Sequence, residues 1–189
     1  TAYEIPKRDW SSDVCSSDLL LGDAVRFDGG HKRDAFISDA LSGFVDWVRV
    51  CPEQEAGFGT PREAMRLVTI DSAIRLVTVR TKRDVTAMLQ DAAAARVADL
   101  TRLDLDGFVL KADSPSCGPA RVKIYSPEGG AIRNGRGLFA AALAGALPDL
   151  PIESEGRLTD PAIREHFFAR VFARRRWRAL TASSPGVDR

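Results

Sequence analysis

Two cysteines, each following a short apolar run, are the residues of this sequence best suited to chemistry. Cys51 ends the run "VDWVRVC", and Cys117 stands in "SPSCG" between proline and glycine. Cysteine thiolates are soft ligands that bind zinc, copper or iron–sulfur clusters. The alternative is that both are small buried hydrophobic side chains, which is common for free cysteine. Because the sequence holds no C-x-x-C pair, spacing alone favours the second interpretation.

Carboxylate, hydroxyl and ammonium groups accompany the two cysteines. Glu53 follows the first cysteine, and a carboxylate beside a metal can act as general acid or base, although a solvated loop carboxylate is the commoner case. Ser114 and Ser116 precede the second cysteine and either donate hydrogen bonds to a ligand or cap a turn. Lys111 ends an apolar run, where it either meets an anion or lies at a solvated rim.

Alternating strands and helices must position these residues. Apolar and alternating runs predict strands, and amphipathic or alanine-rich runs predict helices. The strands are expected at 45–50, 65–70, 73–79 and 106–112, and the helices at 35–44, 84–103, 137–147 and 159–180. This order predicts an α/β fold, a small Rossmann-like and mostly parallel sheet flanked by helices. The loops with Cys51 and Cys117 follow strand ends and should meet at one rim of the sheet.

Composition excludes several classes of protein. The chain has 189 residues, enough for one domain with a core, and 44% of them are hydrophobic. The formal net charge of +1 gives no general attraction to nucleic acid or to an anionic membrane. No apolar run reaches the roughly 20 residues that span a bilayer, and no secretory signal pattern is present, so a cytoplasmic location is expected. Three cysteines do not indicate a disulfide framework.

Two further motifs favour structural interpretations. "GGAIRNGRGLFA" (129–140) is only a weak dinucleotide fingerprint, because Ala140 stands at the third glycine position and no strand is predicted before it. It therefore predicts a turn and a helix start. "ARVFARRRWR" (169–178) is basic and aromatic, but the near-zero net charge argues against nucleic-acid binding. We expect a solvated helix whose Phe168, Phe172 and Trp177 pack inward or dock on a further domain.

Taken together, several motifs resemble one bacterial family, the uncharacterised-domain family that includes 2-thiouracil desulfurase. They are "LLGDAVRFDGGHKRD", "VCPEQEAGFGTPRE", "VLKADSPSCGPARVKIY", "GRGLFAAAL" and "LPIESEGRLTDPAIREHFFARVFARRRWRAL". The resemblance implies a [4Fe–4S] cluster held by three cysteines, with one open iron that takes the sulfur of a small thiolated substrate. The implied activity is desulfuration of a thiolated nucleobase or similar thiocarbonyl compound. The loop "EAGFGTPRE" departs from the desulfurase pattern and leaves the substrate open.

The resemblance also implies roles for particular residues. Cys51 and Cys117 match two cluster ligands, and the third, in a "CLLG" motif, is replaced by Leu19. The matched catalytic residues are Glu53 and Ser114, and the matched substrate-binding residues are Asp28, Lys111 and Ser116. The alternatives from other classes are a non-catalytic cluster-binding or sensing domain, and a nucleic-acid-binding accessory domain.

Residues 1–19 differ from the rest of the chain. Their sequence, with "DWSSDVCSSDL" at 9–19, resembles a translated adapter of short-read sequencing libraries, and we expect a non-native segment. The native apolar first strand would then be missing, Cys15 would not be a ligand, and the fold would be weakened. The expected organisation is a desulfurase-like domain at 20–158, then a linker helix and tail at 159–189 toward an absent C-terminal domain.

Overall fold

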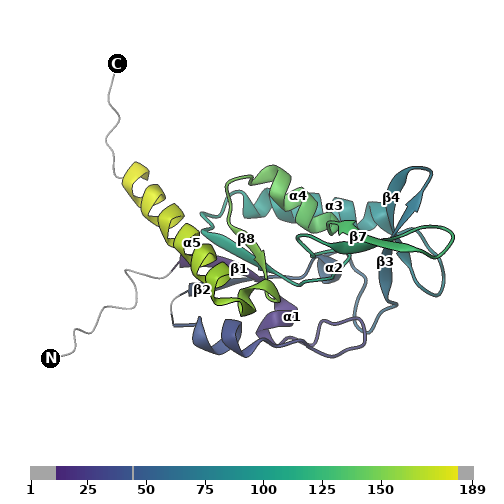
Figure 1. The fold of residues 1–189 in the computed structure, drawn as a ribbon, viewed down its shortest axis with the longest axis horizontal. Helices are drawn as coiled ribbons and strands as arrows, with labels where there is room; N and C mark the ends of the chain where they lie inside the picture. Colours follow the sequence, from purple (N-terminus) through teal and green to yellow (C-terminus); the bar gives the residue numbers. More distant parts are fainter. Residues whose placement is uncertain (1–11, 44, 183–189) are drawn as a thin grey trace, which may run out of the picture.

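A computed structural model describes residues 12–43 and 45–182. Figure 1 shows two sheets side by side, with most of the helices packed around the one that contains β1 and β2. Sheet A has the strand order β2-β1-β5-β8, and sheet B has the order β4-β3-β6-β7. The expectation of a mixed α/β fold with a mostly parallel sheet flanked by helices is confirmed for sheet A.

Sheet A is parallel throughout. Its strands are β2 (Val45–Val50), β1 (Ser12–Ser17), β5 (Gly107–Leu110) and β8 (Ile152–Ser154). β1 is central and pairs with β2 on one side and β5 on the other. After β1 the chain forms β2 on one side of it, and later forms β5 on the other side. This reversal creates a topological switch point at the carboxyl end of β1.

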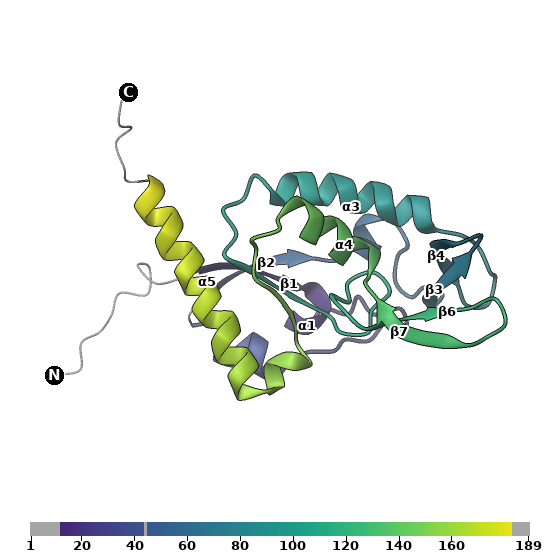
Figure 2. The ribbon, with the colours of Figure 1, turned by 45° about the horizontal axis from the view of Figure 1, so that its top comes forward.

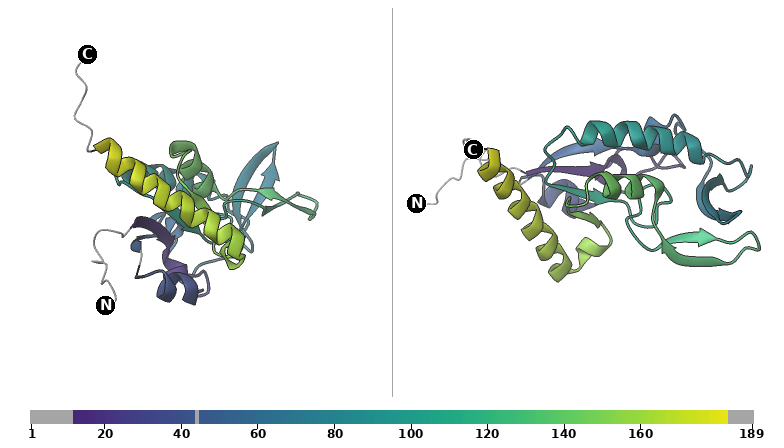
Figure 3. Two further views of the ribbon diagram at one scale, coloured as in Figure 1. Left: turned by 60° about the vertical axis from the view of Figure 1, so that its left-hand side comes forward. Right: turned by 90° about the horizontal axis from the view of Figure 1, so that it is seen from above.

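Alternating side chains of sheet A face two helical layers. Cys15 and Phe108 point to one face, against α3 (Thr86–Leu100) and α4 (Leu138–Ala146). Val14 and Val109 point to the other face, against α1 (Asp18–Leu21), the π-helical turn η1 (Phe36–Ala40) and α5 (Pro161–Ala182). Figures 2 and 3 show α3 next to α4, and α5 at the end of sheet A that lies away from sheet B. The parallel strands are thus covered on both faces.

Sheet B also has four strands and is mixed. It consists of β4 (Ala73–Thr78), β3 (Met65–Ile70), β6 (Val122–Tyr125) and β7 (Ala131–Gly135). β3 and β6 are parallel, and the two outer pairs are antiparallel hairpins. Leu67, Leu76 and Ile124 form a second core with Leu89 of α3. The Cys117 loop connects β5 of sheet A to β6 of sheet B, so one sheet fixes each end of the loop.

The first strand needs a correction. The sequence predicts no strand before residue 20, yet β1 spans Ser12–Ser17 at the centre of sheet A. Val14 and Cys15 are fully buried, and Ser16 and Ser17 are buried too. Small side chains fit between two helical layers, and backbone hydrogen bonds to strands on both sides satisfy the polar backbone. A strand therefore forms at Ser12–Ser17 despite its polar composition. Residues 1–11 of the expected non-native segment lie outside the described residues.

Other elements differ from expectation at their edges. The strands at 45–50 and 65–70 match their predicted bounds, and the helix expected at 84–103 is α3, starting at Thr86. The helix expected at 35–44 is reduced to η1. β6, β7 and β8 were not predicted, nor were the short α2 (Pro52–Glu55) and the 3-10 turn η2 (Arg157–Thr159). No strand was predicted before α4, yet β7 lies there.

The last helix begins as predicted but buries different residues. The Asp160 carboxylate accepts hydrogen bonds from the backbone of Ala162 at 2.9 Å and of Ile163 at 3.3 Å, which caps the helix. Phe167 and Val171 are the buried contacts of α5 with sheet A. Phe168 is partly buried against the same core cluster, whereas Phe172 and Trp177 are 38% and 67% exposed and do not pack inward. Docking of these side chains on a further domain stays a prediction. The predicted tail at 183–189 lies outside the described residues.

Among the described helices, none is both long and apolar enough to cross a membrane.

Candidate functional site

A pocket of about 320 Å³ opens at the carboxyl ends of β1, β2 and β5. These ends meet at the switch point of sheet A, where ligands of open parallel sheets characteristically bind. We call this cavity the thiol pocket. The predicted site residues that line it are Leu19, Cys51, Glu53, Lys111, Ser114 and Cys117. The structure therefore brings together two loops that the sequence separates by more than 60 residues, as expected from their strand-end positions.

Cys51 ends β2 and begins a helical turn. It has extended backbone angles, and α2 follows immediately with Pro52 at its first position. The residue is 8% exposed. Burial raises the pKa of the Cys51 thiol to about 11, and a hydrogen bond to the backbone of Gln54 opposes that rise. The thiol is therefore protonated near neutral pH unless a cation binds to it.

Cys117 is held by a compact loop after β5. The Ser114 hydroxyl accepts hydrogen bonds from the backbone N–H of Ser116 at 3.2 Å and of Cys117 at 3.1 Å. Burial raises the pKa of the Cys117 thiol well above its usual value, and the nearby Glu53 and Cys51 charges add to the rise. Ser114 thus positions this loop as well as lining the thiol pocket.

Two glycines allow this loop to pack closely. A Cβ at Gly118 would lie 2.3 Å from Val122 Cγ2 and 2.8 Å from the Ser114 carbonyl oxygen. A Cβ at Gly137 would lie 2.4 Å from the Ser116 carbonyl oxygen. Gly137 precedes α4, so this glycine of "GRGLF" allows close packing against the cysteine loop, in agreement with the predicted turn and helix start.

Glu53 joins the two cysteine loops. Its Oε2 accepts a hydrogen bond from Arg62 Nε at 2.8 Å and forms an ion pair with the Arg62 guanidinium. Its Oε1 accepts a hydrogen bond from the Ser116 hydroxyl. The side chains of Glu53 and Arg62 are 14% and 8% exposed. Ser116 itself is fully buried beneath the thiol pocket and does not line it.

Lys111 and Asp28 have their own partners. Lys111 forms an ion pair with Glu155, whose carboxylate also accepts a hydrogen bond from the backbone of Ala112 at 2.6 Å. Lys111 lines the thiol pocket, with its charge balanced by Glu155. Asp28 is exposed, pairs with Arg26 and accepts a hydrogen bond from the backbone of Gly30. It does not line the thiol pocket, in contrast to Arg26 and Phe27 beside it.

Sequence reasoning missed Arg62 and Glu155. Each of them balances the charge of a predicted site residue. Arg62 lies 9 positions after Glu53, and Glu155 lies 44 positions after Lys111. Both lie in stretches that carry the family resemblance, Arg62 in "VCPEQEAGFGTPRE" and Glu155 in "LPIESEGRL", but the resemblance implied no role for either. A half-buried charge needs a partner of opposite charge, but this requirement alone does not identify the partner residue.

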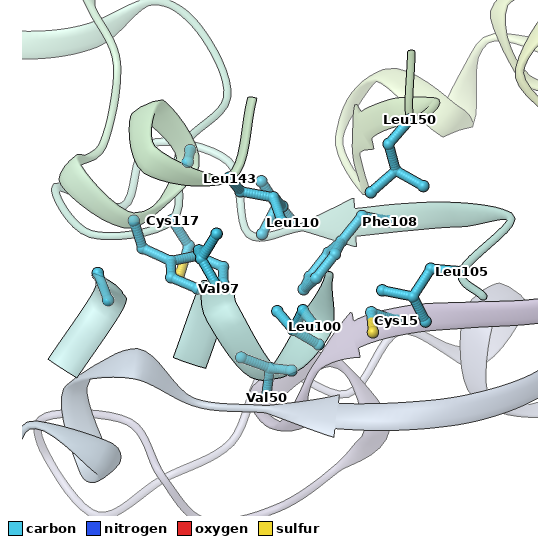
Figure 4. Packing of buried hydrophobic residues seen from close by; sticks show 13 residues of the cluster. Cys15, Val50, Val97, Leu100, Leu105, Phe108, Leu110, Cys117, Leu143 and Leu150 are labelled. Atoms are coloured by element: carbon cyan, nitrogen blue, oxygen red, sulfur yellow. The ribbon is translucent and has the colours of Figure 1, made fainter. Parts of the chain in front are cut away.

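Leu19 and Cys15 lie at different depths. Leu19 belongs to α1, directly after β1, and lines the thiol pocket with Cys51 and Cys117. Cys15 is fully buried in the core cluster, and burial raises the pKa of its thiol to about 12. Figure 4 shows Cys15 near Leu105 and Phe108, and Cys117 at the other end of the cluster. Within residues 12–43 and 45–182, no three His, Cys, Asp or Glu side chains are grouped to hold a metal.

The fold and site define a class, a parallel α/β domain with a thiol-bearing pocket at the carboxyl rim of its sheet. The sequence profile of the 2-thiouracil desulfurase family matches residues 14–155, and the chain belongs to this family. Uncharacterized protein YbbK of Bacillus subtilis (strain 168) is 30% identical over 156 residues, which cover 78% of this chain and 98% of YbbK. The [4Fe-4S]-dependent thiouracil desulfidase TudS has a similar structure, with a TM-score of 0.63 and 28% identity, covering 82% of this chain and 99% of TudS.

Proposed function

We propose that the thiol pocket binds a thiolated nucleobase or a similar thiocarbonyl compound, and that it serves the desulfuration of this compound when position 19 carries a third cysteine ligand. The observation that carries this proposal is the gathering of Cys51, Cys117 and Leu19 around one pocket, at the matched cluster-ligand positions. Family membership and the similarity to TudS support the same reaction. The cavity volume is in the range of small-molecule sites.

The donor set of this chain is incomplete for the cofactor that TudS uses. Two thiols line the pocket, and Leu19 offers no lone pair at the third position. Cys15 faces the apolar core rather than the pocket. The residues present therefore do not fit a [4Fe–4S] cluster held by three cysteines, and we expect little desulfuration from the chain as it stands.

The other residues of the pocket supply binding and proton chemistry. The pocket wall is largely apolar, with Val25, Phe27 and Pro115 contributing, which suits the face of a planar ring. The Glu53 carboxylate lines the pocket while it accepts a hydrogen bond from the Ser116 hydroxyl, so it can exchange a proton with a bound molecule. Arg62 keeps the charge of that carboxylate balanced, and Ser114 keeps the Cys117 loop in place.

The experiment compares the chain with Leu19→Cys and Leu19→Ser after anaerobic incubation with iron and sulfide. Iron content, visible absorption and conversion of 2-thiouracil to uracil are measured. We expect about four irons per chain and turnover only in Leu19→Cys, because three thiolates can then hold the cluster. Leu19→Ser controls for size without a thiolate. Turnover by the unaltered chain equal to that of Leu19→Cys, or no iron in Leu19→Cys, contradicts the proposal.

The incomplete donor set favours a second candidate, a domain that binds the thiocarbonyl compound without turnover. The same chain, titrated with 2-thiouracil by calorimetry, separates the two functions. Saturable binding in both the chain and Leu19→Cys, without sulfide release in either, favours the binding domain.

A further inference from the structure

A second cavity, of about 410 Å³, lies beside the thiol pocket. Its walls come from the loop at 112–121, β7, the start of α4, and the end of β8 with the residues that follow it. Four arginines line it, and we call it the arginine cavity. They are Arg121, Arg133, Arg136 and Arg157. The two cavities share only Ala112 and Asp113, and no cysteine lines the second one.

The charges around the arginine cavity do not balance. Asp113 pairs with Arg133 at 2.7 Å, and Glu153 pairs with Arg157 at 3.0 Å. Arg136 donates only through Nε, to the Pro119 carbonyl oxygen at 2.9 Å. The Arg121 side chain forms no hydrogen bond or ion pair within the described residues. Four arginines against two carboxylates leave a surplus of two positive charges at one cavity.

The backbone holds two of these residues in unfavourable conformations. Asp113 has φ 59° and Arg121 has φ 56°, in the left-handed region that non-glycine residues rarely adopt. Such residues concentrate at ligand-binding sites, where the surrounding structure maintains them. Both line the arginine cavity and bracket the loop that carries Cys117. The conformation of this loop therefore holds Asp113 and Arg121 at the cavity.

We propose that the arginine cavity binds a small phosphate monoester. A phosphate monoester carries close to two negative charges at neutral pH, which matches the surplus. A guanidinium group can donate two parallel hydrogen bonds to the oxygens of one phosphate. Arg121 and Arg136 both have guanidinium nitrogens that are available for such bonds. The small apolar walls, including Ala140, Ala144 and Ile152, leave room for a short organic group next to the phosphate. This inference does not depend on the proposed desulfuration.

The test is calorimetric titration of the full chain with glycerol 3-phosphate, inorganic phosphate and glycerol at constant ionic strength. Four variants are compared: Arg121→Gln with Arg136→Gln, Arg121→Lys with Arg136→Lys, Arg102→Gln, and Lys32→Gln. Arg102 is an exposed arginine at the end of α3, and Lys32 is a cation of the thiol pocket. Circular dichroism verifies that each variant is folded.

We expect saturable binding of glycerol 3-phosphate and none of glycerol. Affinity should fall at least tenfold in the double glutamine variant, fall less in the double lysine variant, and stay unchanged in Arg102→Gln and Lys32→Gln. Equal affinity for inorganic phosphate supports a phosphate site and identifies the free anion as its ligand. The proposal is overturned by an absence of saturable binding, by full affinity in the double glutamine variant, or by a loss confined to Lys32→Gln, which assigns the anion to the thiol pocket.

Discussion

At the scale of single residues, Glu53 links the loops that carry Cys51 and Cys117. Its two carboxylate oxygens are divided between Arg62 and Ser116. The arginine is almost buried, so its charge depends on this one carboxylate. An ion pair of this kind gives little net stability compared with apolar packing, but breaking it is costly because a buried charge remains.

Glu53→Gln tests that dependence. The glutamine oxygen can still accept a hydrogen bond from the Ser116 hydroxyl, but the substitution leaves the Arg62 guanidinium without a counter-charge. We therefore expect a loss of about 3 kcal/mol in the free energy of unfolding. Urea unfolding measures the change. In the double variant Glu53→Gln, Arg62→Met, part of the stability should return, because the buried charge is gone. Glu165→Gln, on an exposed position of α5, is the control. An unchanged midpoint in Glu53→Gln contradicts the ion-pair role.

Ser114 is the second residue with a distinct role. Ser114→Ala removes the acceptor of two backbone N–H groups, and we expect a loss of about 1–2 kcal/mol, as for other side-chain caps. Hydrogen exchange of the Cys117 amide should accelerate, which a uniform loss of stability would not confine to this loop. Ser42→Ala, where the exposed hydroxyl donates only to the Asp39 carbonyl oxygen, should leave that exchange rate unchanged.

The candidate site could be predicted from sequence only where residue type carries the information. Cys51, Glu53, Ser114 and Cys117 follow predicted strands, and strand ends of a parallel sheet share a rim. The position of Asp28 could not be predicted from strand ends, because Asp28 lies in an exposed loop whose sequence has no periodic pattern. Arg62 and Glu155 are visible only once the folded chain brings them to their partners.

At the scale of elements, burial pattern decided which strands were predictable. β2 and β3 are rich in valine, leucine and isoleucine and were assigned with correct bounds. β1 is largely serine and aspartate, and β7 has four exposed residues out of five, so neither carries an apolar signal. Their position comes from backbone pairing with neighbouring strands, a long-range effect that local propensity does not contain.

Two glycines near α4 give a matched prediction at this scale. Gly137→Ala should destabilise the fold by about 1–3 kcal/mol, the usual cost of overpacking, since its Cβ meets the rigid Ser116 carbonyl. Gly145→Ala lies within the same helix with no atom within 4 Å of the added Cβ, and should stabilise by up to about 1 kcal/mol through helix propensity. Thermal unfolding of both variants measures the contrast. Equal shifts in one direction would show that the contact with the cysteine loop does not matter.

At the scale of the whole molecule, polar contacts join α5 to the amino end of β5 in sheet A, opposite the thiol pocket. The fully buried Asp106 precedes β5 and pairs with Arg178 at 2.9 Å, and its other oxygen accepts the backbone N–H of Asp13 at 3.1 Å. Arg174 also donates to the Leu105 carbonyl oxygen at 3.0 Å. Two arginines of the basic stretch of α5, Arg174 and Arg178, therefore bind groups within the domain itself. This contact joins the last helix to the centre of the sheet.

The protonation of Asp106 should make the stability of the fold depend on pH. Burial raises the pKa of Asp106 to about 6, against the lowering effects of the Asp13 backbone and of Arg175 and Arg174. The usual pKa is near 3.8, so between these values the folded state binds more protons than the unfolded state. Stability then falls as pH rises from about 4 to 6. The loss is at most about 3 kcal/mol, and less to the extent that the Arg178 charge favours the ionised form.

Asp106→Asn isolates this effect, because asparagine keeps an acceptor for the Asp13 backbone and does not titrate. Urea unfolding of the chain and the variant at pH 4.5, 5.5, 6.5 and 7.5 gives the difference in unfolding free energy at each pH. We expect the chain to lose stability relative to the variant as pH rises through this window, and the difference to level off above it. Asp104→Asn, which removes a 91% exposed partner of Arg178, should keep the pH dependence of the unaltered chain. A difference between chain and Asp106→Asn that stays constant across all four pH values would mean that Asp106 is already ionised throughout, with Arg178 outweighing the effect of burial.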